Sequence, residues 1–293
     1  MSPLEASSAP LLAHWNLKRH AFQDTPDPSF FFPGGPYRET QERLRYALLG
    51  SDAPFAVLIG PMGSGKTLLS EVLAGEIEKR ELPAVLVRCV TGRPGDIWSQ
   101  IGMETGRDMS PPHGVSPGRH ASLELARAGE TLGKTHRILV DNAQQMPQDD
   151  FEELQWLSEG PGGAGVRTLL AGTEELADRV GRVPAIRDRA LIWTTLRGLT
   201  PAETSDYLAH RLRAAGHAGG EIFDPAAVRV VHHFARGLPR TVNRFCHLAL
   251  EVGALTGARR IGVEEIRRVV LDYYTQRVRV APLLALAESD RGA

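Results

Sequence analysis

One segment constrains this chain more than any other: five apolar residues, FAVLI, followed at once by GPMGSGKT. Its glycines are Gly60, Gly63 and Gly65, and it ends in Lys66 and Thr67. An amphipathic helical pattern comes next, so the sequence predicts a buried strand, a glycine-rich loop and a helix in succession. Glycine lets the backbone approach a ligand closely, and the amides of a helix N-terminus attract anions. A chance glycine-rich turn ending in Lys-Thr would need neither the strand nor the helix.

This loop predicts a binding site for the phosphates of ATP or ADP. The Lys66 ammonium would contact the β- and γ-phosphates, and the Thr67 hydroxyl would complete the shell of a Mg²⁺ ion. ATP and Mg²⁺ are therefore the expected cofactors. The residues expected to touch the nucleotide are Pro61, Met62, Gly63, Ser64, Gly65, Lys66, Thr67 and Leu68.

A second motif, HRILVD, places a carboxylate directly after a short apolar run. Phosphate loops of this kind need an acid at the tip of a neighbouring strand, where it holds Mg²⁺ through water. Asp141 fits that role, so Thr67 and Asp141 are the predicted metal-binding pair. The next residue, Asn142, can orient a water by hydrogen bonding, but its amide cannot accept a proton as a carboxylate can.

Short β-branched runs alternate with helical patterns from residue 54 to residue 198, which predicts a parallel sheet with helices on both faces. The five candidate strands are residues 55–59, 84–90, 138–140, 166–171 and 191–196. After Thr200 the strand pattern stops. The sequence Thr200-Pro-Ala-Glu203 is typical of a capped helix start, and further helices are expected from residue 225 and over 239–253 and 263–274.

These patterns predict an α/β fold with a small all-helical domain after it. The expected divisions are an N-terminal extension with a first helix (1–50), a nucleotide-binding domain (51–198), a helical lid domain (199–276) and a tail (277–293). The net charge of −1 offers no overall field for nucleic acid or anionic lipid. No apolar stretch approaches the roughly 20 residues that span a bilayer, so no membrane span and a cytoplasmic location are expected.

Several further stretches form a pattern that covers residues 14–275. They are residues 15–22 (WNLKRHAF), 25–28 (TPDP), 37–44 (YRETQERL), 141–144 (DNAQ), 169–176 (LLAGTEEL) and 237–243 (GLPRTVN). Together with the phosphate loop, they resemble the ExeA/general-secretion-pathway-A-like AAA+ ATPases, which are related to the TnsC-type transposition regulators. The resemblance implies a P-loop AAA+ core with a parallel five-stranded sheet, followed by a helical lid.

The resemblance also shows where this chain departs from the family. Hydrolytic AAA+ proteins normally carry Glu at the position of Asn142, where it polarises the attacking water. Losing a general base typically costs about 10²- to 10⁴-fold in rate, so tight ATP binding with slow hydrolysis is expected. Asp149, Asp150 or a neighbouring subunit could supply a substitute base, although Pro147 separates the two acids from the strand tip.

Four further side chains acquire expected roles from the resemblance. Thr173 matches the sensor-1 position, and Arg240 matches the sensor-2 arginine that contacts the γ-phosphate from the same chain. Arg187 or Arg189 falls where an arginine finger would reach a neighbouring subunit's nucleotide.

Each of these roles has a plainer alternative. Arg187 and Arg189 could be solvated charges or could pair with Asp188 and Glu174. Thr173 could simply cap the helix that follows it.

The leading functional hypothesis is a nucleotide-dependent assembly factor that builds a homo-oligomeric ring or filament and acts on a partner protein, in secretion, pilus or envelope assembly. The alternative is an ATP-dependent DNA-binding regulator of transposition, since arginines of the helical part could form a basic face. No base-reading motif accompanies those arginines. A third hypothesis is a conventional ATPase motor despite Asn142.

Overall fold

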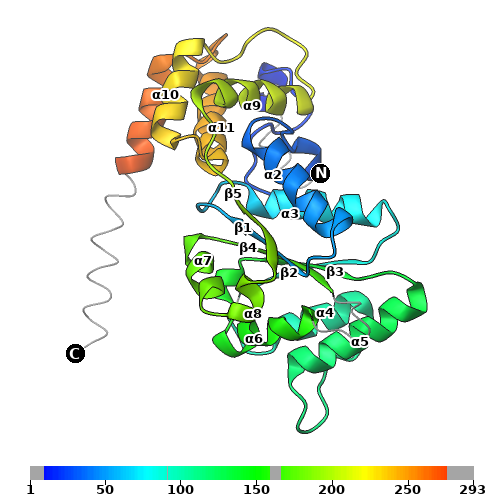
Figure 1. The fold of residues 1–293 in the computed structure, drawn as a ribbon. Coiled ribbons are helices and arrows are strands. Elements are labelled where there is room, and N and C mark those ends of the chain that lie inside the picture. The colour runs from blue at the N-terminus through cyan, green and yellow to red at the C-terminus, as the bar shows by residue number, and fades with distance from the viewer. Residues whose placement is uncertain (1–9, 91, 159–165, 276–293) are drawn as a thin grey trace, which may run out of the picture. The chain divides into compact units, whose positions relative to one another are not determined.

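The computed structural model describes residues 10–275, except residue 91 and residues 159–165. The described chain forms two compact units (Figure 1). One is the α/β unit, Pro26–Arg197. The other, the helical unit, joins residues 10–25 to residues 198–275. The structure thus divides the expected segment 1–50 after residue 25, while the expected tail, 277–293, lies outside the described residues.

The α/β unit contains one sheet in the order β2-β3-β4-β1-β5, and every neighbouring pair is parallel. The expected parallel five-stranded sheet is confirmed. The second strand stops at Arg88, before the predicted end at residue 90, because its pairing with the neighbouring strand ends at Arg88 and Asp141. The strands are β1 Phe55–Ile59, β2 Ala84–Arg88, β3 Arg137–Asp141, β4 Arg167–Gly172 and β5 Ala190–Thr195.

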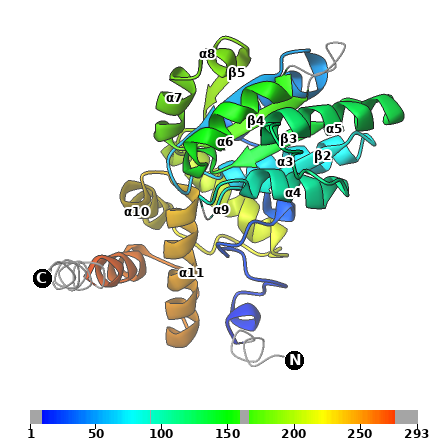
Figure 2. The same ribbon diagram turned by 90° about the horizontal axis from the view of Figure 1, so that it is seen from below.

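Helices cover both faces of this sheet, which is why its strands are near-continuous apolar runs. On one face lie α2 (Pro36–Arg45) and α3 (Lys66–Glu78). The other face carries α4 to α8, as Figures 1 and 2 show from two directions. Their bounds are α4 Asp96–Thr105, α5 Pro117–Leu132, α6 Gln148–Glu153, α7 Glu174–Gly181 and α8 Pro184–Arg187. Short helical turns occupy Pro28–Phe30, Tyr46–Gly50, Ala143–Gln145 and Leu154–Ser158.

The chain changes direction across the sheet after β1, because α3 leads past β4 and β3 to the edge strand β2. The later strands then fill the sheet from β2 back towards β1. Ligands of open α/β sheets bind where such a change occurs, beyond the carboxyl ends of the strands. Three predicted site segments follow β1, β3 and β4, and so the fold brings them to this edge.

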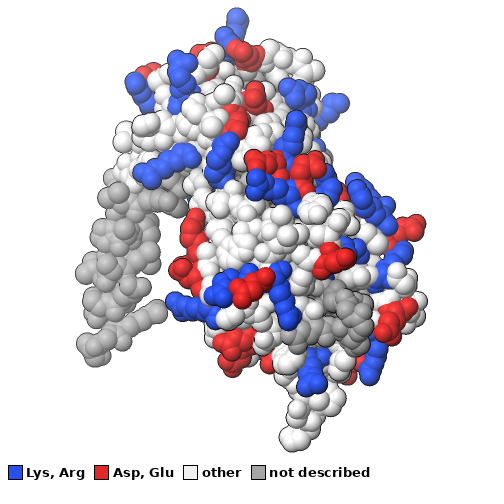
Figure 3. All heavy atoms as spheres, viewed as in Figure 1, with Lys and Arg blue, Asp and Glu red and all other residues white. Residues whose placement is uncertain are grey.

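Charged side chains of both signs are interspersed over the face drawn in Figure 3. This agrees with the net charge of −1. On that face, the molecule offers no broad surface of a single sign that would attract a polyanion at long range.

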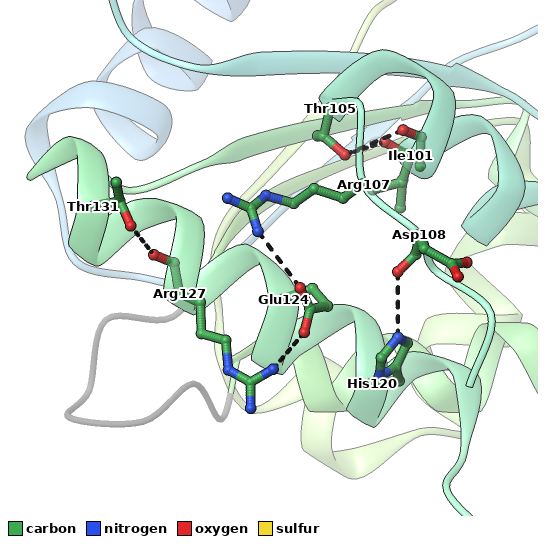
Figure 4. A network of polar contacts seen from close by, with 9 residues as sticks. Ile101, Thr105, Arg107, Asp108, His120, Glu124, Arg127 and Thr131 are labelled. Atoms are coloured by element: carbon green, nitrogen blue, oxygen red, sulfur yellow. Dashed lines mark hydrogen bonds and ion pairs between the residues drawn. The ribbon is translucent and has the colours of Figure 1, made fainter. Parts of the chain in front are cut away.

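The connection between α4 and α5 is held by polar contacts (Figure 4) and by Met109, which is buried in the apolar core. Glu124 accepts hydrogen bonds from Arg107 at 3.5 Å and from Arg127 at 2.5 Å. The ring Nε2 of His120 lies 3.3 Å from the carbonyl oxygen of Asp108. These contacts orient the long helix α5 against the segment that precedes it.

The helical unit is built on α9 (Pro201–Ala214), α10 (Pro225–Ala235) and α11 (Pro239–Thr256), with residues 263–275 also helical. The predicted capping box is present: Glu203 N donates to Thr200 Oγ1 at 3.3 Å, and Thr200 N donates to Glu203 Oε2 at 2.7 Å. Segment 10–25 is tied to these helices, because Arg211 Nε donates to the Ala21 carbonyl at 2.6 Å. None of the described helices has the length and apolarity needed to cross a membrane.

Candidate nucleotide-binding site

The glycine-rich loop follows β1 and has the backbone conformation that its sequence predicts. Gly63 and Gly65 have φ angles of 83° and 99°, in the left-handed region that favours glycine. At Gly60, an added Cβ would lie 2.7 Å from the Leu196 carbonyl oxygen, so only glycine fits. The loop can therefore curve tightly between β1 and α3 and turn its amides towards a ligand.

The Lys66 side chain lies over the curve of this loop. It is buried, and its Nζ donates hydrogen bonds to the carbonyl oxygens of Gly60 at 2.7 Å and Pro61 at 3.1 Å. A phosphate seated on the loop would meet this ammonium directly. The electrostatic attraction between them would be strong because water has little access to the buried charge.

The helix α2 supports the loop from outside, which the sequence did not predict. The Tyr37 hydroxyl donates to the Ser64 carbonyl at 2.7 Å, and its ring would stand 3.1 Å from a Cβ on Gly65. The only sign of this contact in the sequence is an aromatic residue at the start of the first expected helix. Tyr37 therefore fixes the position of the loop's last turn.

The predicted metal-binding residues come together at the tips of β3 and α3. The Thr67 hydroxyl donates to Asp141 Oδ2 at 2.6 Å. Asp141 is 1% exposed, and its Oδ1 has no hydrogen-bond partner among the described residues. A buried carboxylate oxygen without a partner is costly, and a hydrated cation would satisfy it. One hydroxyl and one carboxylate also suit Mg²⁺, which keeps several waters and takes further oxygens from phosphates.

A second acidic group lies near this pair. Burial raises the pKa of the Glu71 carboxyl on α3; Arg88, its ion-pair partner, lowers the pKa, and the charge of Asp141 raises it. Arg88 ends β2 and is the register partner of Asp141 in the sheet. The edge that holds Thr67 and Asp141 therefore carries two carboxylates, and Arg88 pairs with one of them.

Asn142 stands directly after Asp141 with φ 54° and ψ 38°, a left-handed conformation that asparagine tolerates better than most residues. Its carbonyl accepts the Gln145 N–H at 2.9 Å and starts a short helical turn. The residue that could activate water is thus an amide on a fixed, strained turn. Asp150 does not replace the missing base, because its two carboxylate oxygens accept hydrogen bonds from Gly95 N at 2.7 Å and Trp98 Nε1 at 2.9 Å.

Thr173 follows β4 at the same edge of the sheet. Its hydroxyl is buried and has no partner among the described residues, and it makes no capping hydrogen bond to α7. The alternative of a simple helix cap therefore lacks its defining contact. Gln144 Oε1 accepts the Thr173 N–H at 3.3 Å and would lie 2.5 Å from a Cβ on Gly172, which joins the ends of β3 and β4.

The remaining predicted arginines lie on exposed surfaces. Arg187 ends α8 and pairs with Asp188 at 2.7 Å, one of the plainer alternatives considered above. Arg189 Nη1 donates to Ser158 Oγ at 2.6 Å. Arg240 is exposed near the start of α11 in the helical unit. None of these contacts tests the finger or sensor roles, which stay predictions.

Comparison with known proteins agrees with this fold. Residues 49–180 match a family model described as an AAA domain. The chain is 28% identical over 257 residues to general secretion pathway protein A of Aeromonas hydrophila, covering 84% of this chain and 45% of that protein. It is 26% identical over 223 residues to replication factor C small subunit 2 of Pyrobaculum arsenaticum, covering 75% and 58%. The chain thus spans about half the length of these curated relatives.

Solved structures share the fold at low sequence identity. The ORC2 protein of Aeropyrum pernix, solved as ADPNP–ADP complexes, superposes with a TM-score of 0.66 at 16% identity, covering 87% of this chain and 71% of that one. The ORC1 protein of the same organism, solved in complex with DNA, gives 0.61 at 19% identity, covering 89% and 69%. The RuvB branch migration motor of Thermotoga maritima gives 0.52 at 16% identity, covering 80% and 67%.

The fold, the phosphate loop and these matches define an AAA+ protein. Within that class, the resemblance inferred from the sequence is confirmed: the chain is similar to the ExeA/GspA-like AAA+ ATPases over most of its length.

Proposed function

We propose that this chain binds ATP and Mg²⁺ at the loop Gly60–Thr67 and acts as a nucleotide-dependent assembly factor with slow hydrolysis. One observation carries the proposal: the Thr67–Asp141 pair is intact, while Asn142 follows it in place of an acid. The residues that would hold a metal nucleotide are in place, and the position of the usual proton acceptor carries an amide.

Binding and hydrolysis depend on different parts of this site. Affinity comes from the loop amides, Lys66 and the metal ion that Thr67 and Asp141 would hold. Hydrolysis also needs a group that takes a proton from water, and its loss costs about 10²- to 10⁴-fold. ATP should therefore remain bound for long periods, as suits a switch rather than a motor.

The bound nucleotide would act by promoting self-association of the chain. Arg187 and Arg189 follow each other closely on an exposed edge, where either could reach the phosphates of a second copy. The pairing of Arg187 with Asp188 does not oppose this, because exposed ion pairs exchange partners readily. We propose a ring or filament that then engages a partner protein.

The decisive experiment measures binding and size together. Calorimetry with Mg·ATP should give a measurable heat, and light scattering should report a larger species with ATP than without it. Arg187→Ala or Arg189→Ala should abolish the increase in size while calorimetry still detects Mg·ATP binding. The exposed Arg182 provides the matched control, since Arg182→Ala should change neither. A protein that stays monomeric with ATP refutes the assembly role.

The cellular setting is proposed from the Aeromonas relative, whose name refers to general secretion. On that basis we propose a role in secretion, pilus or envelope assembly, with a cytoplasmic location. Genes for such machinery beside this one would support the setting, whereas a neighbouring transposase gene would favour the alternative.

The alternative, a DNA-binding regulator, is favoured by exposed arginines on and between α10 and α11, among them Arg229, Arg236, Arg240 and Arg244. Charges on the face drawn in Figure 3 are mixed, so any basic surface would have to be local. Fluorescence anisotropy on a DNA duplex distinguishes the two functions. ATP-dependent binding that weakens steeply with salt supports DNA contact, and its absence at low salt eliminates it.

A further inference from the structure

Arg179, near the end of α7, holds the loop that follows β3. Its Nη1 donates to the carbonyl oxygens of Gln144 at 2.8 Å and Met146 at 2.5 Å, with a longer contact of 3.4 Å to Ala143. The guanidinium carbon lies 4.5 Å from the centre of the Phe151 ring. One side chain therefore binds several backbone carbonyl oxygens of the turn that begins at Asn142, where the family carries its water-activating residue.

The chemistry of this contact needs arginine. Burial lowers the pKa of Arg179, because the cation gives up hydration for backbone oxygens and a ring face. A planar guanidinium can stack on Phe151 and donate in its own plane at the same time, which an ammonium cannot. An apolar side chain would fill the space without the cost of burying a charge. The arrangement therefore points to a positioning role beyond packing.

The same loop is fastened to β4 at its other side. The backbone carbonyl of Gln144 accepts a hydrogen bond from Arg179, and its side-chain oxygen accepts one from the Thr173 N–H. The turn after Asp141 and the start of α7 are thus joined by two contacts. A shift of the β3 tip, as the shell of a metal nucleotide changes, would be passed to α7.

From α7 the connection continues to the surface that carries the candidate finger. The Arg187 Nη1 lies 3.4 Å from the Gly181 carbonyl, and the Arg187 N–H donates to the Val183 carbonyl at 3.0 Å. Only Arg182 and Val183 separate α7 from α8. The two short helices contact each other and can move as one piece.

We propose that Arg179 is a positioning residue that couples the turn after Asp141 to α8, so that the nucleotide held by one chain sets how Arg187 is presented to a second copy. This inference rests on the proposed function, since it assumes that the loop binds a nucleotide and that α8 faces a neighbouring chain. It adds a pathway inside the chain that can be measured without assembly.

The test is hydrogen–deuterium exchange of residues 183–189, in protein too dilute to assemble, with Mg·ADP or a slowly hydrolysed Mg·ATP analogue. The wild type should show exchange rates that differ by about threefold or more between the two nucleotides. Arg179→Met should remove the difference, Arg179→Lys should retain part of it, and the control Arg182→Met should retain all of it. Calorimetric affinity should stay within about threefold in every variant, a small fraction of the energy that holds the nucleotide.

Three outcomes overturn the inference. One is an exchange difference that survives in Arg179→Met. Another is the absence of any difference in the wild type although calorimetry detects both nucleotides. The third is a loss of thermal stability and affinity in Arg179→Met that accounts for the whole effect, because that marks a structural role only. A wild type that binds no nucleotide refutes the proposed function itself, and the inference falls with it.

Discussion

The Thr67 hydroxyl donates a 2.6 Å hydrogen bond to Asp141 Oδ2, across 74 residues of sequence. The contact places the first turn of α3 against the tip of β3 and leaves Asp141 Oδ1 buried without a partner among the described residues. This geometry suits a cation, because a hydrated metal ion would provide a partner for Asp141 Oδ1. The predictions below follow from this site and from the packing around it.

Lys66→Ala should weaken Mg·ATP binding by about tenfold to hundredfold, as expected for the loss of roughly 1.5–3 kcal/mol from a charged hydrogen bond. Calorimetry measures the affinity. Lys79→Ala, an exposed change at the other end of the same helix, is the control and should leave the affinity unchanged. Equal affinities for the two variants would contradict the site.

Asn142→Glu should increase ATP turnover by up to about 10²-fold, the lower limit for restoring a general base. The gain is limited because the left-handed backbone at φ 54° is less favourable for glutamate than for asparagine. Steady-state phosphate release measures the effect. Asn142→Gln has the same side-chain length as Glu but no base, so a glutamate variant no faster than the glutamine variant would argue against a missing proton acceptor.

Tyr37→Phe should lower the free energy of unfolding by about 1 kcal/mol, because the buried Ser64 carbonyl loses its donor. It should also weaken nucleotide binding, since the last turn of the loop is then less well fixed. Urea denaturation and calorimetry measure the two effects. Tyr46→Phe, at a residue 58% exposed, removes a hydroxyl from the same segment and should change neither quantity.

Stability should fall as the pH is lowered through about 6.5, partly because of His136. Burial lowers the pKa of His136 from its usual 6.5, with further lowering by Arg107 and Arg137. The unfolded chain therefore binds a proton first as pH falls, so each such histidine removes up to about 1.4 kcal/mol per pH unit. Urea unfolding between pH 7 and 5 should show a shallower slope for His136→Gln.

The control for that series is His113→Gln, at an exposed histidine in the connection between α4 and α5. This variant should keep the wild-type slope. If His136→Gln also kept it, the buried ring would have no part in the pH dependence of folding.

Features that depend on neighbours in the sequence were predicted well. Apolar runs gave the five strands because a strand of a parallel sheet is buried on both faces. Glycine spacing gave the phosphate loop because the left-handed angles at Gly63 and Gly65 are a local requirement. The capping box at Thr200 is also a contact between residues three apart.

Contacts between distant residues depended on the fold. Asp150 could be a substitute base by its place in the sequence, but the folded chain uses it to bind Gly95 and Trp98. Tyr37 and Gln144 carried no distinguishing signal, since their partners are a backbone carbonyl and a backbone N–H that the sequence does not mark.

The sequence by itself determined the class of this protein, the glycine-rich loop expected to bind phosphate, and the amide that follows Asp141 in place of an acid. These properties are fixed by residue type and spacing along a single strand, turn or helix. Only the tertiary structure decided how the turn after Asp141 is held. The packing of α7 against this turn brings the Arg179 guanidinium to the carbonyls of Gln144 and Met146. Backbone carbonyls are the same at every residue, so no sequence pattern could have named that partner.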